Sequence, residues 1–204
     1  MNTIDLKALW ISACTRLSAD GAAEWAHIEA AYSAPSRHYH TLQHLCDVYA
    51  DLHEYYVGKV PTATVFALFF HDIIYSALRG DNEKRSADHA ANMLYQWDGD
   101  KALAARVATM IEATATHESS DVEAQLFLDA DMAILGAPAE RYNIYIAAVR
   151  KEYSIYPDLI YNAGRRKFAE ATSRRERIFL TDYFHRRYEA QARINLAHEL
   201  TLLT

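Results

Sequence analysis

The sequence predicts an all-α protein, and three observations support that prediction. Apolar residues recur at helical spacing along most of the 204-residue chain. No stretch of useful length alternates between polar and apolar residues, as a half-buried strand would. Six glycines and four prolines are few for this length, whereas a turn-rich β-sandwich needs more of both. We therefore expect a single-domain helical bundle over residues 1–204, with about eight or nine helices.

Helical periodicity in the first half predicts two helices over residues 3–18 and 22–33, and a third from about Ser36 to Tyr56. The third would be capped by Ser33 or Ser36. One face of it carries an apolar stripe made of Leu42, Leu45, Tyr49, Leu52 and Tyr56.

The middle of the chain begins with a segment, 62–72, that is apolar on every side, which is typical of a central buried helix. Asp81 or Asn82 can cap the helix that runs through Trp97. A further helix follows "DGD" and continues to about Ala115.

The last third continues the helical pattern over residues 122–135, 138–155 and 157–172. Gly136 would close the first of these. Ser173 and Glu176 have the spacing of a capping box, which predicts the start of a long final helix.

Composition narrows the classes of protein to be considered. No run of 18 or more apolar residues exists, so we expect no membrane span. The first residues lack the apolar core of a signal peptide, and two cysteines form no CxxC motif. We therefore expect a cytoplasmic protein with reduced thiols.

Charge is distributed unevenly along the chain. Residues 1–160 carry 12 basic and 22 acidic side chains, whereas residues 161–204 carry 9 and 5. The basic clusters "GRRKF", "SRRER" and "HRRYE" could meet phosphate, but solvated helix faces are the more frequent explanation. We expect no nucleic acid partner for a chain of net charge −6, because the phosphate backbone is itself negatively charged.

Several histidines fall on the predicted third helix. Arg37, His40 and His44 share one flank of its apolar stripe. His38 lies nearer the stripe, where we expect a core histidine bonded to the backbone, and His53 is expected to be solvated. By itself, an HxxxH pair is more often incidental than a metal site.

Ionisable residues also interrupt two apolar segments. His71 and Asp72 directly follow Phe69 and Phe70. Adjacent residues of a regular helix point about 100° apart, so these two side chains can face one point only near a helix end or from a shared crevice. Two aspartates, Asp129 and Asp131, interrupt "LFLDADMAILG". Buried carboxylates usually pair with cations or bind metal. Two imidazoles with two carboxylates suit Mn, Fe, Co, Ni or Zn better than Mg.

The order His44, His71-Asp72, Asp131 resembles the HD-domain superfamily of metal-dependent phosphohydrolases. The chain is also similar to a bacterial family of predicted HD-superfamily hydrolases of about 200 residues. The segments that carry this similarity are "PSRHYHTLQHL", "FFHDIIY", "DNEKRSADHA", "IEATATH", "FLDADMAILG" and "VRKEY". This resemblance covers roughly residues 30–155.

The resemblance implies one divalent metal ion, held by His44, His71, Asp72 and Asp131. His40 and Asp129 are the rival ligands. Asp131 is preferred because the family has an alanine before the ligand, and because Asp129 would face about 160° away on a helix. Some HD proteins bind a second metal ion through two extra histidines, and the two that fall in the same interval here are His89 and His117. We expect one ion, with His117 near the site and His89 at the surface or in packing.

The resemblance also implies a reaction, the hydrolysis of a phosphoester by a water that the metal activates. Asp72 would orient or deprotonate that water, and His40 would act as a general acid. Residues expected to contact the substrate are Arg37, Glu83, His117 and Arg150. Two alternatives stay open, a salt bridge from Arg37 to an acidic neighbour and helix capping by Glu83 alongside Asn82. The expected substrate is a nucleotide or a related small phosphorylated compound.

Two other readings stay open at the level of sequence. A nucleotide-sensing module would keep the fold and the metal but bind its ligand without turnover. A purely structural helical protein would use His71-Asp72 as a buried polar pair. Substrate identity, a second metal ion and assembly as a homodimer are not decided by the sequence.

Overall fold

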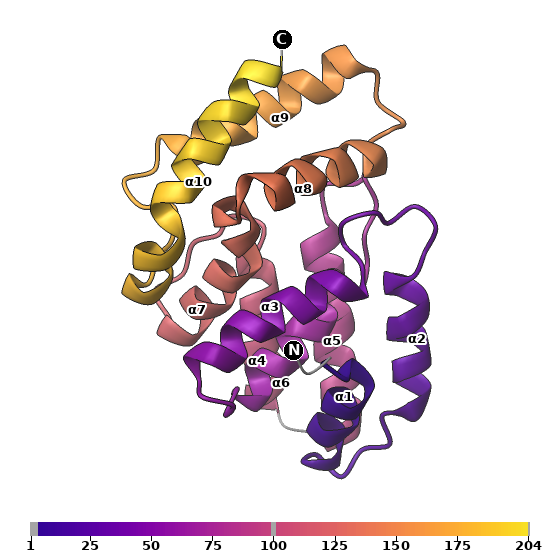
Figure 1. The fold of residues 1–204 in the computed structure, drawn as a ribbon. Coiled ribbons are helices and arrows are strands. Elements are labelled where there is room, and N and C mark those ends of the chain that lie inside the picture. Colours follow the sequence, from indigo (N-terminus) through magenta and orange to yellow (C-terminus); the bar gives the residue numbers. More distant parts are fainter. Residues whose placement is uncertain (1–3, 99–100, 204) are drawn as a thin grey trace. The chain divides into compact units, whose positions relative to one another are not determined.

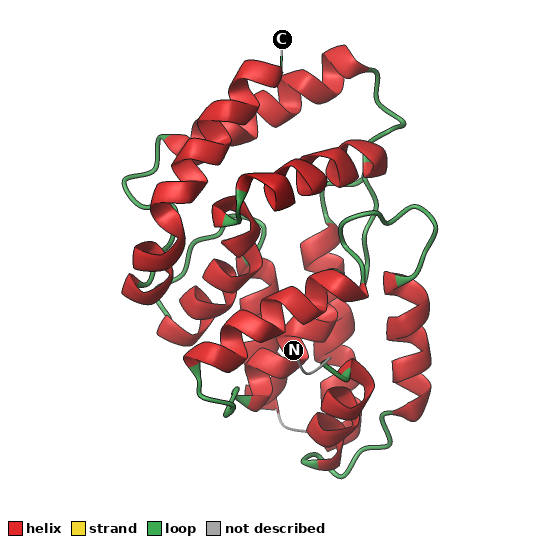
Figure 2. Ribbon diagram, in the orientation of Figure 1, coloured by secondary structure: helices red, strands yellow, loops and turns green. Residues whose placement is uncertain are grey.

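The computed structural model describes residues 4–98 and 101–203, and all their regular structure is helical (Figure 2). These residues form ten α-helices and one 3-10 helix, so the all-α prediction is confirmed and the helix count is slightly higher than expected. The elements are α1 (Leu6–Thr15), α2 (Ala22–Tyr32), α3 (Leu42–Tyr55), α4 (Thr62–Phe70), α5 (Asn82–Asp98), α6 (Lys101–Ala113), α7 (Val122–Asp131), the 3-10 helix η1 (Met132–Gly136), α8 (Ala139–Glu152), α9 (Asp158–Ser173) and α10 (Asp182–Leu202) (Figure 1).

The chain divides into two compact units, one that ends at Leu128 and one that begins at Asp129. The first contains α1 to α6 and most of α7, and the second contains η1 and α8 to α10. The segment expected to form the metal-site core, 30–155, has parts in both units. A single domain over the whole chain stays a prediction.

The core of the first unit is built around α4, which packs against α1, α3, α5 and α6. Every residue of α4 from Ala63 to Phe70 is buried, which confirms the prediction of a central apolar helix. The Trp10 ring of α1 meets the edges of three α4 phenylalanines, with ring centroids 5.1–5.6 Å apart. Each fully buried phenylalanine contributes about 1.5–3 kcal/mol, so packing of α4 in the core helps to fix the position of the residues that follow it.

The start of the third helix was predicted wrongly, because α3 begins at Leu42 and not near Ser36. Thr41 occupies the N-cap position with extended backbone. The apolar stripe also begins at Leu42, so the polar segment before it has no apolar face to bury and stays outside the helix. Arg37 and His40 therefore lie in the loop between α2 and α3, and the exposed His38 is no core histidine. His53 is exposed, as expected.

In the second unit, α10 packs against η1 and α9. The buried Arg165 of "GRRKF" donates from Nε and Nη2 to the Glu199 carboxylate, at 2.6 and 3.1 Å. Its Nη1 donates to the Tyr145 hydroxyl at 3.1 Å. The expectation of a solvated helix face is thus wrong for Arg165, because partners from other helices satisfy its guanidinium.

The predicted capping box is also wrong. Ser173 is the last residue of α9, and α10 begins at Asp182 with Thr181 in the N-cap position. The loop between them is held by a distant side chain, because the Glu189 carboxylate accepts from the backbone N–H groups of Ile178 and Phe179 at 3.0–3.3 Å. Local spacing alone could not predict that contact.

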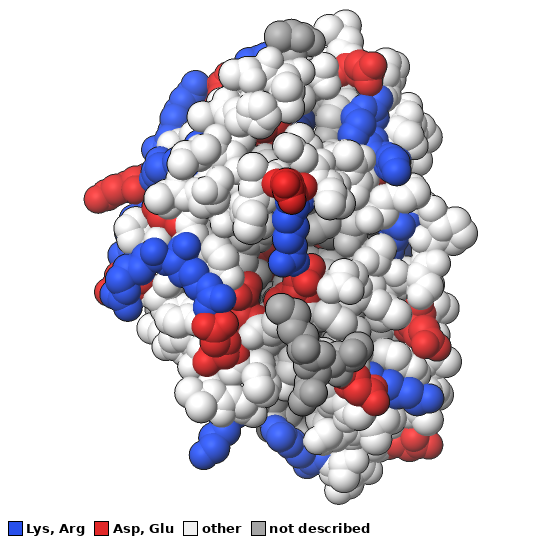
Figure 3. All heavy atoms as spheres, viewed as in Figure 1, with Lys and Arg blue, Asp and Glu red and all other residues white. Residues whose placement is uncertain are grey.

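The surface carries charges of both signs. Figure 3 shows lysine and arginine side chains interspersed with aspartate and glutamate on the face in view. Arg174 of "SRRER", for example, pairs with Glu170 one turn earlier, at 3.0 Å. Within the part of the chain that the structure describes, no helix is both long enough and apolar enough to cross a membrane.

Candidate metal centre

The centre begins where α4 ends. His71 is the C-cap residue of this helix and is 1% exposed, and Asp72 follows it in a turn. The His71 Nε2 atom lies 3.2 Å from Asp72 Oδ2, so the two neighbouring side chains face one point. They meet just beyond a helix end, as the sequence predicted for an adjacent pair.

His44 brings a second imidazole to the same point from the first turn of α3. Its Nε2 atom lies 3.2 Å from His71 Nε2 and 3.9 Å from Asp72 Oδ2, and its side chain is 2% exposed. The three atoms form a triangle with sides of 3.2, 3.2 and 3.9 Å. The centre of the circle through these three atoms lies about 2.0 Å from each of them, which matches the length of a metal–ligand bond to zinc.

The tautomer of His71 is set by the backbone of α4. His71 Nδ1 donates a hydrogen bond to the Leu68 carbonyl at 2.9 Å, because a carbonyl oxygen can only accept. In the neutral ring the proton is therefore on Nδ1, and the lone pair of Nε2 points at His44 and Asp72. A histidine that ligates a metal is usually oriented by such a bond from its other nitrogen.

The donor set fits a divalent ion. Two imidazole nitrogens and a carboxylate oxygen are the ligands that Zn, Fe, Mn, Co and Ni share. The Phe127 ring of α7 packs edge-on against the His71 ring, with centroids 5.6 Å apart, so the back of the centre is apolar. The described residues of the first unit thus contain a group of two buried histidines and one half-buried aspartate that could hold a metal ion.

Two groups that the sequence did not reveal hold the chain in place around Asp72. The Tyr32 hydroxyl of α2 donates to the Phe69 carbonyl at 3.1 Å and accepts from the Asp72 N–H at 3.2 Å. Asn82 of α5 bonds both backbone groups of Ser76, at 2.9 and 3.1 Å. Asn82 was expected only as a helix cap, whereas it ties the segment after the centre to α5.

Arg37 and His40 approach the same region from the loop before α3. The buried Arg37 guanidinium donates to the carbonyls of His40 and Ile73, at 3.2 and 3.1 Å, and stacks on the Tyr32 ring. These contacts favour a positioning role, so phosphate binding by Arg37 stays a prediction. His40 is 21% exposed, and its Nε2 lies 3.9 Å from Asp72 Oδ2.

Asp129, the alternative ligand to Asp131, instead accepts hydrogen bonds from the loop before α10. Its buried carboxylate accepts from the backbone N–H groups of Leu180 and Thr181, both at 2.7 Å, and from the Thr181 hydroxyl at 2.6 Å. These bonds anchor Leu180 and the N-cap residue Thr181, which lead into α10. Burial raises the pKa of Asp129, although the three hydrogen bonds oppose that rise. Asp131 is half-buried and belongs to the second unit, so its place as fourth ligand stays a prediction.

The other predicted substrate residues are spread over several elements. Glu83 lies half-buried in the first turn of α5, and His117 follows α6 with a left-handed backbone (φ 53°). Arg150, in the second unit, donates to the carbonyls of Tyr153 and Tyr156, at 3.0 Å each, and holds the loop after α8. Substrate contact by these three residues stays a prediction.

Comparison with family models, with curated proteins and with solved structures found no match to this chain. Membership of the HD superfamily is therefore not shown.

Proposed function

We propose that this protein is a metal-dependent phosphohydrolase that acts on a nucleotide or a related small phosphorylated compound. The observation that carries the proposal is the triangle formed by His44 Nε2, His71 Nε2 and Asp72 Oδ2, whose dimensions suit one divalent ion. A divalent ion that takes six ligands would keep coordination positions at this centre for water and for a phosphoryl oxygen.

Asp131 is the fourth ligand in this proposal, as the resemblance to the HD superfamily implies. Because Asp129 is occupied by the start of α10, it does not compete for the ion.

The chain's own residues have distinct roles in the proposed reaction. A divalent ion held by His44, His71 and Asp72 would supply a Lewis acid, and bound water would then be acidic enough to lose a proton near neutral pH. The Asp72 carboxylate, which is half-buried, orients that water and receives its proton. His40 gives a proton to the leaving oxygen of the phosphoester, and Arg37 fixes the backbone of His40 through the carbonyl bond.

The surroundings of His40 favour a substrate with a planar group. Its ring lies against Tyr75 and Tyr39, with centroids 4.4 and 4.9 Å away. Stacking of a base on an aromatic side chain is worth about 1–3 kcal/mol. A nucleobase next to a reacting phosphate is therefore a reasonable fit to this aromatic surface.

A phosphate-release screen tests the proposal. The purified protein is assayed with a panel of nucleotides and sugar phosphates in the presence of Mn²⁺, Co²⁺, Ni²⁺ or Mg²⁺. We expect at least one substrate to be hydrolysed, and Asp72→Asn to reduce kcat by 10²-fold or more, since a positioned general base contributes about 10²–10⁴-fold. Asp88→Asn is the matched control, because Asp88 is an exposed acid of α5 that pairs with Lys84.

Two other outcomes would replace this proposal. Tight nucleotide binding without turnover under every metal would make the protein a sensor. Failure to bind any divalent ion would leave a structural group, since the same contacts also suit hydrogen bonds in which His44 Nε2 carries a proton.

A further inference from the structure

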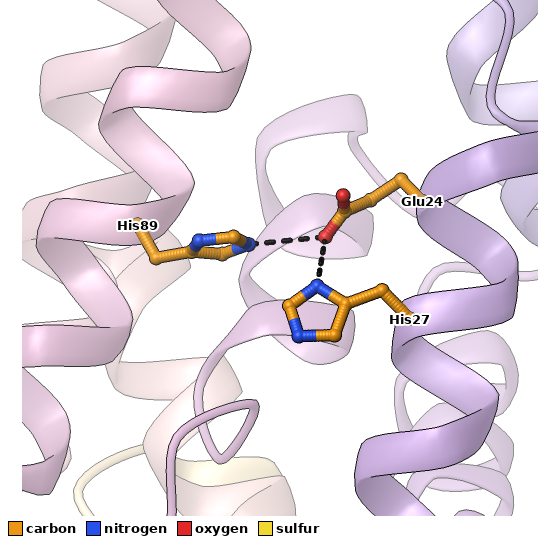
Figure 4. A group of neighbouring side chains, drawn as sticks. All are labelled: Glu24, His27 and His89. Carbon is orange, nitrogen blue, oxygen red and sulfur yellow. Dashed lines mark hydrogen bonds and ion pairs between the residues drawn. The ribbon is translucent and has the colours of Figure 1, made fainter.

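We propose that the first unit contains a second metal site, formed by Glu24 and His27 of α2 with His89 of α5, that takes a borderline transition ion such as Zn²⁺ or Co²⁺. Figure 4 shows these side chains converging from two helices on one carboxylate oxygen. The site shares no residue with the His44 centre, so the proposal of this site does not depend on the proposed function.

Donor geometry is the first argument for the site. Glu24 Oε1 lies 3.1 Å from His27 Nδ1 and 3.0 Å from His89 Nε2, and all three donor atoms fall within 4.8 Å of one another. Ligands of a tetrahedral ion at bond lengths of about 2.0–2.1 Å are separated by about 3.3–3.4 Å. The two measured separations are within a few tenths of an ångström of that value.

The local sequence explains why two of the donors coincide. Glu24 and His27 are three residues apart on α2, so their side chains lie on one helical face. The His27 and His89 rings are nearly perpendicular, at 84°, with centroids 5.3 Å apart. Two rings in this arrangement can direct one nitrogen each at a common point without clashing.

Burial is graded across the site, which suits an ion that must enter from solvent. Glu24 is buried, the His89 side chain is 24% exposed, and the His27 side chain is 51% exposed. The Phe70 ring of α4 packs against the His89 ring, with centroids 5.5 Å apart. An ion would therefore have apolar surroundings on its inner side and an accessible position for water beside His27.

The Glu24 carboxyl is in the form that metal binding needs. Burial favours the neutral carboxyl of Glu24, but hydrogen bonds from His89 and His27 outweigh burial and lower the pKa of Glu24. The carboxylate is therefore ionised near neutral pH, as metal binding requires. Two imidazoles with one carboxylate form a set that binds Zn²⁺ readily, whereas Ca²⁺ requires six to eight oxygens.

Such an ion would link α2 to α5, two helices whose donors are 65 residues apart in the sequence. The alternative is a metal-free hydrogen-bonded group in which both histidines donate to Glu24. Both descriptions join the two helices, but only the first makes the stability of the folded protein depend on Zn²⁺.

Zinc titration of the full chain separates the two descriptions. Bound Zn²⁺ is measured by competition with a chromophoric chelator, and melting temperature is followed with and without Zn²⁺. His27→Gln is the test variant, because a half-exposed side chain can be replaced without harming the core. His53→Gln is the matched control, since it removes one exposed histidine elsewhere in the same unit.

We expect wild type and His53→Gln to bind one more equivalent of Zn²⁺ than His27→Gln or Glu24→Gln. At a free Zn²⁺ concentration of 100 times Kd, this site should raise the melting temperature by about 5–10 °C, and the variants should lose that rise. Equal stoichiometry and equal melting shifts in all four proteins would overturn the proposal. Repeating the titration in Asp72→Asn separates this site from the His44 centre, because the extra equivalent should persist there.

Cobalt substitution gives a readout that does not depend on stability. Co²⁺ at a site of two nitrogens and one carboxylate should give visible d–d absorption that His89→Gln abolishes and His53→Gln keeps. Unchanged absorption in His89→Gln would show that the cobalt is bound elsewhere, and would contradict the site even if zinc stabilises the protein.

Discussion

The Tyr32 hydroxyl is the contact through which α2 holds Asp72 in place, and its removal tests the geometry of the centre. In Tyr32→Phe the ring and its stacking under Arg37 are retained. Only the oxygen atom is lost, together with its bonds to the Phe69 carbonyl and to the Asp72 N–H. The variant thus separates hydrogen bonding from packing.

The expected loss of stability follows from those two bonds. A neutral hydrogen bond contributes about 0.5–1.5 kcal/mol net, and Tyr32 is 1% exposed, so water cannot easily replace the oxygen. We expect the free energy of unfolding to fall by about 2 kcal/mol, which corresponds to about 4–8 °C in melting temperature for a chain of this size. Affinity for Mn²⁺ should fall as well, because the backbone of Asp72 is no longer held.

Urea denaturation measures the first effect, and calorimetric titration with Mn²⁺ measures the second. Tyr95→Phe is the matched control, since Tyr95 is exposed on α5 and should lose its hydroxyl without consequence. If Tyr32→Phe is as stable as the control and binds Mn²⁺ equally well, the hydroxyl does not position Asp72 and the reasoning is wrong.

Three further predictions concern buried polar groups. Burial raises the pKa of Cys14 to about 12, so iodoacetamide at pH 8 should leave this thiol unlabelled in the folded protein and label it in 8 M urea; labelling at equal rates would contradict this. Asp129→Ala should destabilise the protein by about 3 kcal/mol in a urea titration, because the start of α10 loses three hydrogen bonds, and a loss below 1 kcal/mol would refute that role. Arg37→Met keeps the apolar stem but frees the carbonyls of His40 and Ile73, so phosphate release should fall more than tenfold while metal content stays constant; unchanged turnover would exclude positioning of His40 by Arg37.

The sequence predicted those features that depend on local pattern. Continuous apolarity over 62–72 identified the central helix α4, because a helix that is apolar on every side can only be buried. The same segment placed His71 and Asp72 at a helix end, and that position lets their side chains meet. The apolar stripe from Leu42 onward was also recognised, although the helix was extended too far towards the N-terminus.

What the sequence could not predict are contacts between residues far apart in the chain. Arg37 reaches the Ile73 carbonyl across 36 residues, and Asp129 reaches Thr181 across 52. Asp129 was a candidate for chemistry because a buried charge needs a partner, and Arg37 because it was placed on the same helix face as His44. Arg37 donates to backbone carbonyls, whereas Asp129 accepts from backbone N–H groups and from the Thr181 hydroxyl. Helical periodicity carries no information on such partners. Arg37 and His40, which lie in the loop before α3, were for this reason predicted to lie on the helix itself.

The most direct test of the metal centre is anomalous X-ray scattering from crystals of the protein loaded with Mn²⁺ or Zn²⁺. Our account predicts a peak about 2.0–2.2 Å from the Nε2 atoms of His44 and His71 and from the carboxylate of Asp72. An ordered, metal-soaked crystal with no anomalous density between these three side chains would contradict the proposed hydrolase.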